Sequence, residues 1–136
     1  MNIFVLSDNS VLAANMMCDK HVVKMVLETA QMLSTNVLMY DPDAKGFYDM
    51  VHKNHPCTKW ARQTRRNFSW LVNHGIALAD SYRDRYGRTH KSEEVIRRAA
   101  GFMHHFPVGP QTAFAKAMPE KFKKNFPDAV EAYRHY

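Results

Sequence analysis

The segment CDKHVVKMVLETAQML, residues 18–33, carries polar side chains at spacings of three and four residues: His21, Lys24, Glu28 and Gln31. At about 100° per residue on a helix, this spacing gathers them within an arc of about 80°. An imidazole, an ammonium and a carboxylate on one face can serve as base, anion contact or nucleophile, and acid. The alternative is a structural network in which Lys24 and Glu28 form an ordinary ion pair.

The rest of the same segment is apolar, and Met25, Met32 and Met39 follow one flank of the polar stripe. A surface helix has a broad polar face and one apolar stripe, which is the reverse of this pattern. We therefore expect an interior helix whose polar arc faces other buried polar groups or a cleft. A buried charge costs several kcal/mol unless it is paired, so these side chains must pair or contact a ligand.

A second cluster, HKNHP, covers residues 52–56 and directly precedes a predicted helix. Unpaired amides and the positive end of the helix dipole favour an anion at such a place. His52 and Asn54 are candidate substrate contacts, and His55 is a candidate catalytic residue because histidine titrates near neutrality. Trp60, one helical turn later, could provide a stacking surface or a pocket wall.

Basic residues suggest a polyanionic partner. The chain has a formal net charge of +6, and Lys and Arg that neutralise phosphates release condensed counterions. Arg62, Arg66 and His90 could contact a nucleic-acid backbone, although a basic helix face is most often solvated surface. A nucleic acid or a nucleotide is therefore the expected partner.

Metal binding has a weaker basis. Two thiols and two imidazoles could form a zinc set from Cys18, His21, His55 and Cys57, but their spacings match no known zinc finger or knuckle. The sequence also has no P-loop, GxGxxG, GxSxG or HExxH motif. We expect no metal and no cofactor, since a buried free cysteine is the commoner fate.

The composition fits one compact domain over residues 1–136. Hydrophobic residues make up 46% of the chain and charged residues 24%, and no apolar run is long enough to span a bilayer. The chain start NIFVL lacks the features of a signal peptide. With two cysteines and no disulfide framework, we expect a protein of the reducing cytoplasm that does not associate with membranes.

The elements that must position these residues are mainly helices. We predict a short β-strand at Asn2–Leu6, which could pair across a homodimer, and a single-domain helical bundle after it. The predicted helices follow from cap and stop signals. They are a brief one from Ser7 or Asp8 to Met17, then Asp19–Tyr40, Thr58 to a stop at Gly87, Lys91–Ala100 and Asp128–His135. Residues 43–57 read as a loop in which Gly46–Val51 could form a helical turn, and prolines divide residues 107–127 into short turns.

Three blocks carry a resemblance. CDKHVVKM, KNHPCTKWAR and RYGRTHK, in this order, resemble a family of small helical proteins encoded by bacteriophages, and AMPEKF with DAVEAYRHY resembles its C-terminal portion. The resemblance covers nearly the whole chain. It implies an intracellular protein of the infected host cell that acts on DNA bases or nucleotides.

Three functions follow as hypotheses. We favour a DNA base-processing enzyme, a glycosylase or a group transferase on a modified base, that extrudes a nucleotide into a pocket. In it Glu28 and His21 supply acid and base, and Lys24 contacts negative charge. The amine of the chain start is a weaker candidate nucleophile, because Met1 before Asn2 is poorly removed. The alternatives are a non-catalytic protein that binds nucleic acid or a nucleotide signal, and a metal-dependent phosphohydrolase.

Overall fold

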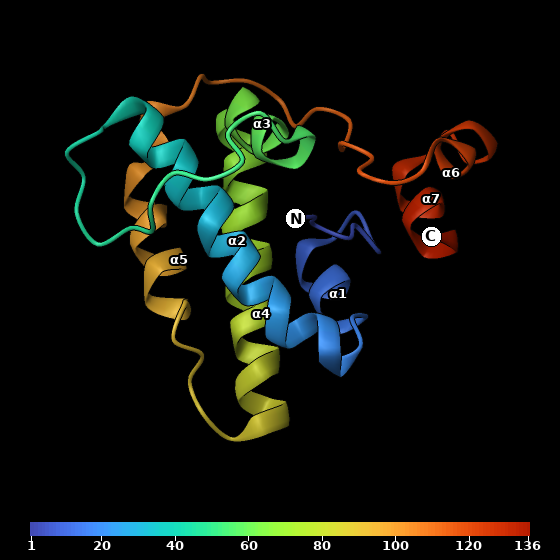
Figure 1. Cartoon of the computed structure of the whole chain (residues 1–136), viewed down its shortest axis with the longest axis horizontal. Coiled ribbons are helices and arrows are strands. Elements are labelled where there is room, and N and C mark those ends of the chain that lie inside the picture. The colour runs from blue at the N-terminus through green and yellow to red at the C-terminus, as the bar shows by residue number, and fades with distance from the viewer.

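The computed structural model describes all 136 residues and is mainly α-helical (Figure 1). Its elements are α1 (Ser10–Asn15), α2 (Asp19–Tyr40), α3 (Pro56–Gln63), α4 (Arg65–Tyr86), α5 (Glu93–Ala99), the 3₁₀ helix η1 (Ala100–His105), α6 (Glu120–Asn125) and α7 (Ala129–His135). The mainly α fold class is confirmed. No helix is long and apolar enough to cross a bilayer.

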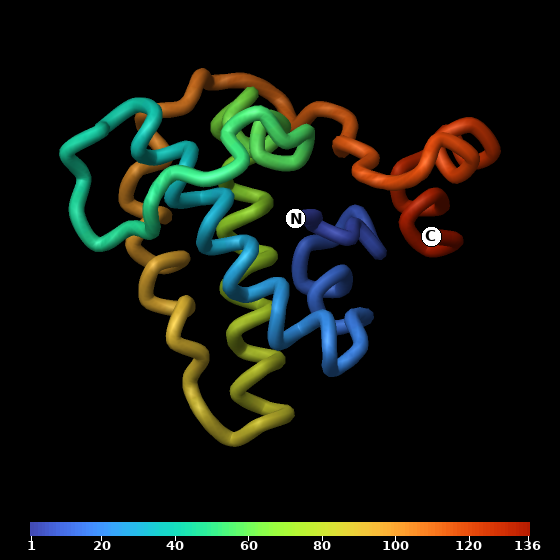
Figure 2. Tube along the Cα trace, in the orientation of Figure 1, coloured from blue at the N-terminus to red at the C-terminus, as the bar shows by residue number.

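Two long helices form the centre of the molecule. α2 and α4 lie side by side and run in opposite directions, with α5 on one side and α1 on the other (Figures 1 and 2). A Cβ atom on Gly75 of α4 would lie 2.9 Å from the Thr29 side chain of α2 and 3.0 Å from that of Ile96 of α5. The glycine therefore allows these three helices to approach closely.

α2 has the predicted bounds. Its end follows from Pro42, because the residue before a proline avoids the α region, and Asp41 has left the helix at φ −137° and ψ 81°. Val22, Met25, Val26 and most later residues are buried, which confirms an interior helix. The segment after α2 is the predicted loop, and it contains no helical turn between residues 46 and 51.

The single helix predicted from Thr58 to Gly87 is wrong. The chain leaves the helical conformation at Thr64, at φ −139° and ψ 158°, and α3 and α4 are separate helices. The Thr64 hydroxyl caps α4 by accepting from the Asn67 N–H, and the Arg65 N–H donates to the Pro107 carbonyl instead of to a helical turn. The predicted end is confirmed, because Gly87 adopts the left-handed conformation that glycine favours.

The predicted β-strand at Asn2–Leu6 is also wrong. Phe4 has a φ of 57°, which breaks an extended run, and the Asn2 side-chain oxygen accepts from the N–H groups of Ile3 and Phe4. Ile3 and Val5 are buried in the core of the same chain. The basis for a homodimer paired through this strand is therefore absent.

The two ends of the chain meet. The C-terminal segment lies beside residues 1–6 (Figure 1), where Asn2 Nδ2 donates to the Ala117 carbonyl at 2.8 Å and Arg134 Nε donates to that of Leu6 at 2.9 Å. α7 was predicted, and the Asp128 carboxylate caps it. α5 is shorter than predicted because η1 continues from its end, and α6 was not predicted.

Stability should fall in acid because of His74. This side chain is fully buried in α4, and its Nδ1 lies 2.9 Å from the Ser10 carbonyl oxygen. Burial lowers the pKa of His74 from 6.5 to about 4. The unfolded chain binds this proton more readily than the folded chain. The contribution of neutral His74 to the free energy of unfolding is therefore complete above pH 6.5 and is lost as the pH falls from 6.5 through 4. We expect it to cost about 3 kcal/mol of unfolding free energy between pH 7 and pH 4.

Urea denaturation at several pH values measures this loss. The variant His74→Gln should show a flatter pH dependence, whereas the exposed-site variant His104→Gln should keep that of the original chain. An unchanged pH dependence in His74→Gln would contradict the assignment.

Candidate active site

A pocket of about 420 Å³ lies between the first half of α2, the chain start and the C-terminal segment. Its volume lies within the range of about 300–1,000 Å³ that is typical of small-molecule sites. α2 provides Lys20, His21, Lys24, Met25 and Glu28; the chain start provides Met1, Asn2 and Phe4; and the C-terminal segment provides Ala117 and Tyr136. Three members of the predicted polar stripe, His21, Lys24 and Glu28, therefore face one hollow.

The terminal amine of Met1 lies beside the Glu28 carboxylate in this pocket. It is 3.2 Å from Glu28 Oε1, and the side chains of Met1 and Glu28 are 4% and 11% exposed, although Met1 as a whole is only half-buried. Glu28 forms no ion pair with Lys24, although the two are four residues apart on one helix. The ordinary surface pair that was the alternative explanation of the stripe is thus not formed.

Several contacts fix the first two residues. Asn2 is buried, and its side chain donates to the Ala117 carbonyl at 2.8 Å and accepts from the Ile3 N–H at 2.8 Å. The Met1 thioether lies 3.7 Å from the Thr58 hydroxyl, at the start of α3. Because both residues are held, the amine has a defined position relative to Glu28.

Aromatic rings form one side of the pocket. The positive φ of Phe4 places its ring parallel to that of His21, with centroids 4.7 Å apart and planes 15° apart. The Tyr136 ring is also roughly parallel to Phe4, at 6.4 Å. His21 is half-buried, and Lys24 is exposed without an ion pair, so both can contact a ligand.

His55 lies next to the terminal amine without lining the pocket. Burial lowers its pKa, and the positive charges of the chain terminus and of His52 lower it further, while the Met1 backbone and Glu28 act in the opposite direction. Its Nδ1 accepts from the Cys57 N–H at 3.1 Å and so caps α3. In the neutral ring the proton is therefore on Nε2.

The other polar residues predicted for the site lie elsewhere. Gln31 is half-buried but does not line the pocket, and Thr35, further along the stripe, bonds to the Val51 backbone and anchors the loop. His52 and Asn54 are exposed, and His52 has a φ of 50°. The HKNHP cluster approaches the pocket only through His55.

Four other residues predicted to contact the substrate do not line the pocket. They are bonded to other parts of the protein or lie on another face of it. Trp60 is 2% exposed and donates to the Thr112 carbonyl, so its ring is not free for stacking. Arg62 donates to Asn36 and to the Lys53 carbonyl. His90 lies 3.1 Å from the Val23 carbonyl and accepts from the Ser92 N–H. Arg66 is exposed, beside Trp70.

The four residues considered for zinc do not form a metal site. No three His, Cys, Asp or Glu side chains lie in an arrangement that could hold a metal ion. Cys18 is exposed and Cys57 is buried, and burial raises the pKa of the Cys57 thiol to about 11. A thiol with such a pKa is a poor source of the thiolate that zinc requires.

Sequence reasoning gave too little weight to three groups of this pocket: the chain-start amine was only a weaker candidate nucleophile, and Phe4 and Tyr136 had no assigned role. A main-chain amine has no side-chain signal, so the position of Met1 depends on the contact of Asn2 with a residue 115 positions away. Phe4 was predicted as part of a strand, and Tyr136 lay just beyond the predicted last helix, Asp128–His135. The sequence feature that could have indicated a site at the chain start is Asn2, a polar residue within an otherwise apolar run.

Comparison with known proteins gives one match. A family model described as pyrimidine dimer DNA glycosylase matches residues 1–94. This range includes all the pocket residues of α2 and of the chain start, whereas Ala117 and Tyr136 lie beyond it. No curated protein and no solved structure matches the chain.

Proposed function

The chain belongs to the pyrimidine dimer DNA glycosylase family, and on this basis we propose that it releases a damaged or modified base from DNA in the pocket around Glu28. The observation that carries the proposal is the amine of Met1 at 3.2 Å from a buried carboxylate. An amine can attack the sugar carbon of a nucleotide, and a neighbouring carboxylate can move the necessary protons.

The proposed chemistry begins with a proton transfer from the Met1 amine to Glu28. The amine nitrogen then attacks C1′ of the deoxyribose, while the bond from C1′ to the base breaks and its electron pair leaves with the base. Glu28, now protonated, returns its proton to the departing base. The C1′–O4′ bond then breaks as the attacking nitrogen, which still carries two protons, gives one of them to O4′. This leaves a protonated imine between the amine and C1′, which water hydrolyses to an abasic site and free enzyme.

His55 is proposed as a positioning residue for this amine. Its lowered pKa keeps the ring neutral near pH 7, so it adds no second positive charge beside the terminal amine. The positive charge of the chain terminus is itself one cause of this lowered pKa, so the ring and the amine lie close enough to interact. His55 also caps α3 through Nδ1, so a rigid helix end fixes its position.

Positive and aromatic side chains at the rim are proposed to hold the DNA. Glycosylases extrude the target nucleotide into a pocket, and an aromatic ring can stack on the extruded base. Phe4, supported by His21, provides such a ring, while Lys20 and Lys24 bring positive charge to phosphates beside it. His52, Asn54 and Arg66 are exposed candidates for contacts with the flanking strand, and Gln31 for a polar contact deeper along α2.

The test uses duplex oligonucleotides that contain a cyclobutane pyrimidine dimer, a substituted thymine or only ordinary bases. We expect cleavage of the bond between base and sugar, seen as alkali-labile strand breaks, in a damaged or modified duplex and not in the ordinary one. Sodium borohydride should reduce the imine and produce a covalent protein–DNA adduct. Tight, salt-dependent binding without release or adduct would instead indicate a non-catalytic DNA-binding protein.

A further inference from the structure

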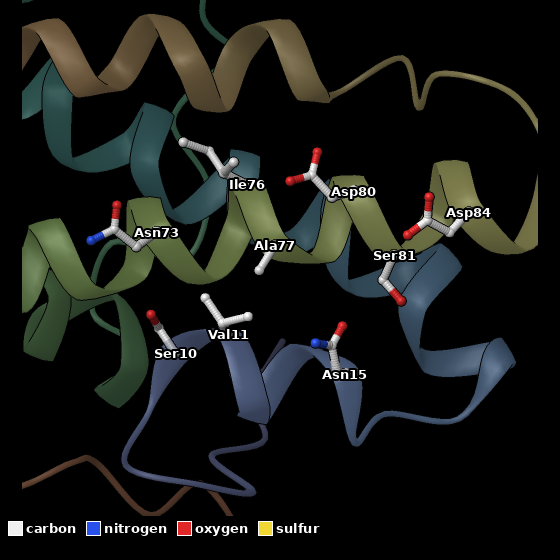
Figure 3. Close-up of a pocket in the computed structure, with 9 residues that line it drawn as sticks. All are labelled: Ser10, Val11, Asn15, Asn73, Ile76, Ala77, Asp80, Ser81 and Asp84. Atoms are coloured by element: carbon white, nitrogen blue, oxygen red, sulfur yellow. The ribbon is translucent and has the colours of Figure 1, made fainter.

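One wall of the pocket around Glu28 has no secondary structure of its own. In the groove between α1 and α4, which also has a volume of about 420 Å³, every lining residue belongs to one of the two helices (Figure 3). The pocket around Glu28 has α2 on one side, but its other side consists of the chain start, Ala117 and Tyr136, which lie in no helix or strand. Side-chain contacts must therefore position this wall.

A buried hydroxyl fixes residues 115–117, which make no hydrogen bond to another backbone group. The hydroxyl of Tyr133 in α7 accepts from the Ala117 N–H and donates to the Ala115 carbonyl, at 3.0 Å in each case. Tyr133 is 3% exposed, and burial raises the pKa of its hydroxyl, so the group stays protonated and can donate. Hydrogen bonds that are shielded from water are stronger than exposed ones. One side chain thus holds both ends of this three-residue segment.

Ala117 transmits this restraint to the chain start. Its carbonyl accepts from Asn2 Nδ2 at 2.8 Å, and the Asn2 side-chain oxygen accepts from the next two backbone N–H groups. Asn2 is 7% exposed and directly follows Met1, whose amine lies 3.2 Å from Glu28 Oε1. A continuous series of contacts therefore leads from Tyr133 through Ala117 and Asn2 to the terminal amine.

The Tyr133 ring is itself held by neighbours from two other parts of the chain. The hydroxyl lies 4.0 Å from Sγ of Cys57, a fully buried residue of α3, and this sulfur is also 3.8 Å from Asn2 Oδ1. The Phe4 ring meets the Tyr133 ring edge to face, with centroids 6.3 Å apart. These contacts restrict the ring and so fix the position of its hydroxyl.

We propose that Tyr133 is a positioning residue for the terminal amine. The inference rests on the proposed base release around Glu28 and names the side chain that places its nucleophile. Tyr133 does not line the pocket, so it acts through Ala117 and Asn2. Misplacement of a reacting group by about 1 Å can cost about 10²-fold in rate. The residues that match the family, 1–94, thus supply the amine and the carboxylate, while the positioning residue lies beyond them.

Acetylation of the Met1 amine tests this position in the absence of DNA. A short reaction with an acetyl ester at pH 7, followed by peptide mass spectrometry, gives the rate at Met1 relative to that at the exposed Lys45. The reaction should be slow in the original chain, because Glu28 pairs with the amine. Tyr133→Phe keeps the ring and removes only the hydroxyl, and it should raise the relative rate several-fold.

Single-turnover base release provides the second measurement. Tyr133→Phe should lower its rate by about ten- to a hundredfold, as expected for a displaced reacting group. The affinity for the duplex should change little, since Tyr133 does not reach the pocket surface. The matched control is Tyr48→Phe, which removes a hydroxyl that bonds to that of Ser92 at 2.9 Å, away from the pocket. It should keep both rates of the original chain.

Asn2→Leu tests the route from Tyr133 to the amine. Leucine keeps the shape of asparagine without its donor and acceptor, and intact mass should verify that Met1 is retained. The losses in Tyr133→Phe and Asn2→Leu should overlap, so the double variant should release bases little more slowly than the slower single variant.

Additive losses, or unchanged acetylation in a folded Tyr133→Phe chain, would overturn the inference. If Tyr133→Phe does not fold, unchanged acetylation in Asn2→Leu overturns it instead, because this variant breaks the next contact of the series. If the original chain releases no base from any duplex, the proposed function fails, and the acetylation rates still decide whether Tyr133 positions the amine.

Discussion

Replacement of Glu28 by glutamine should slow base release by about 10²- to 10⁴-fold, the usual contribution of a proton-transferring side chain. Glutamine keeps the size of the buried side chain and can still accept a hydrogen bond from the Met1 amine. It cannot take up the proton that the amine must lose, nor return it to the departing base. Single-turnover rates on the substrate duplex measure the effect, and DNA affinity should change little.

The matched control is Glu94→Gln, because Glu94 is an exposed carboxylate of α5 that pairs with Arg98 away from the pocket. Its rate should equal that of the original chain. Melting temperatures of both variants separate a loss of catalysis from a loss of folding. A folded Glu28→Gln protein that retains the original rate would remove Glu28 from the proposed chemistry.

Extension of the chain before Met1 should abolish both base release and the borohydride adduct. An added Gly-Ser pair converts the amine into an amide, which is not nucleophilic, and displaces the new terminus from Glu28. The informative control has alanine at position 1 with a free amine, since it removes the methionine side chain and keeps the nucleophile. This control should still form the adduct, and intact mass should verify both chain starts.

Lys24 is the competing candidate for the nucleophile. Its ε-amine also lines the pocket and could form an imine. If the extended chain still forms an adduct and Lys24→Arg does not, the nucleophile is the lysine. If both variants lose base release but only the extended chain loses the adduct, Lys24 acts as the anion contact.

Local signals were sufficient to predict most of the helices, but not the break between α3 and α4 or the presence of α6. The bounds of α2 follow from its apolar pattern and from Pro42, and the end of α4 follows from Gly87. The break at Thr64 could not be predicted, because it depends on contacts with residues 40 to 50 positions away. Arg65 bonds to Pro107 there, and Asn67 bonds to Thr112.

One wall of the candidate site could be predicted from the sequence, and the other could not. Helical spacing alone places His21, Lys24 and Glu28 on one face, and the structure brings them to one pocket. The opposite wall was expected from the HKNHP cluster, but Met1, Phe4 and Tyr136 form it. Spacing cannot reveal such a wall, since its residues come from the two ends of the chain.

The meeting of the chain ends has a consequence for synthesis on the ribosome. Asn2 and Leu6 emerge long before their partners Ala117 and Arg134, which are 115 and 128 positions later in the chain. Contacts over such separations form late, because loop-closure entropy opposes them until most of the chain is present. In a nascent chain, the Met1 amine and the Glu28 carboxylate are therefore exposed before the C-terminal segment is present to enclose them. The enclosure that would make them reactive forms only later.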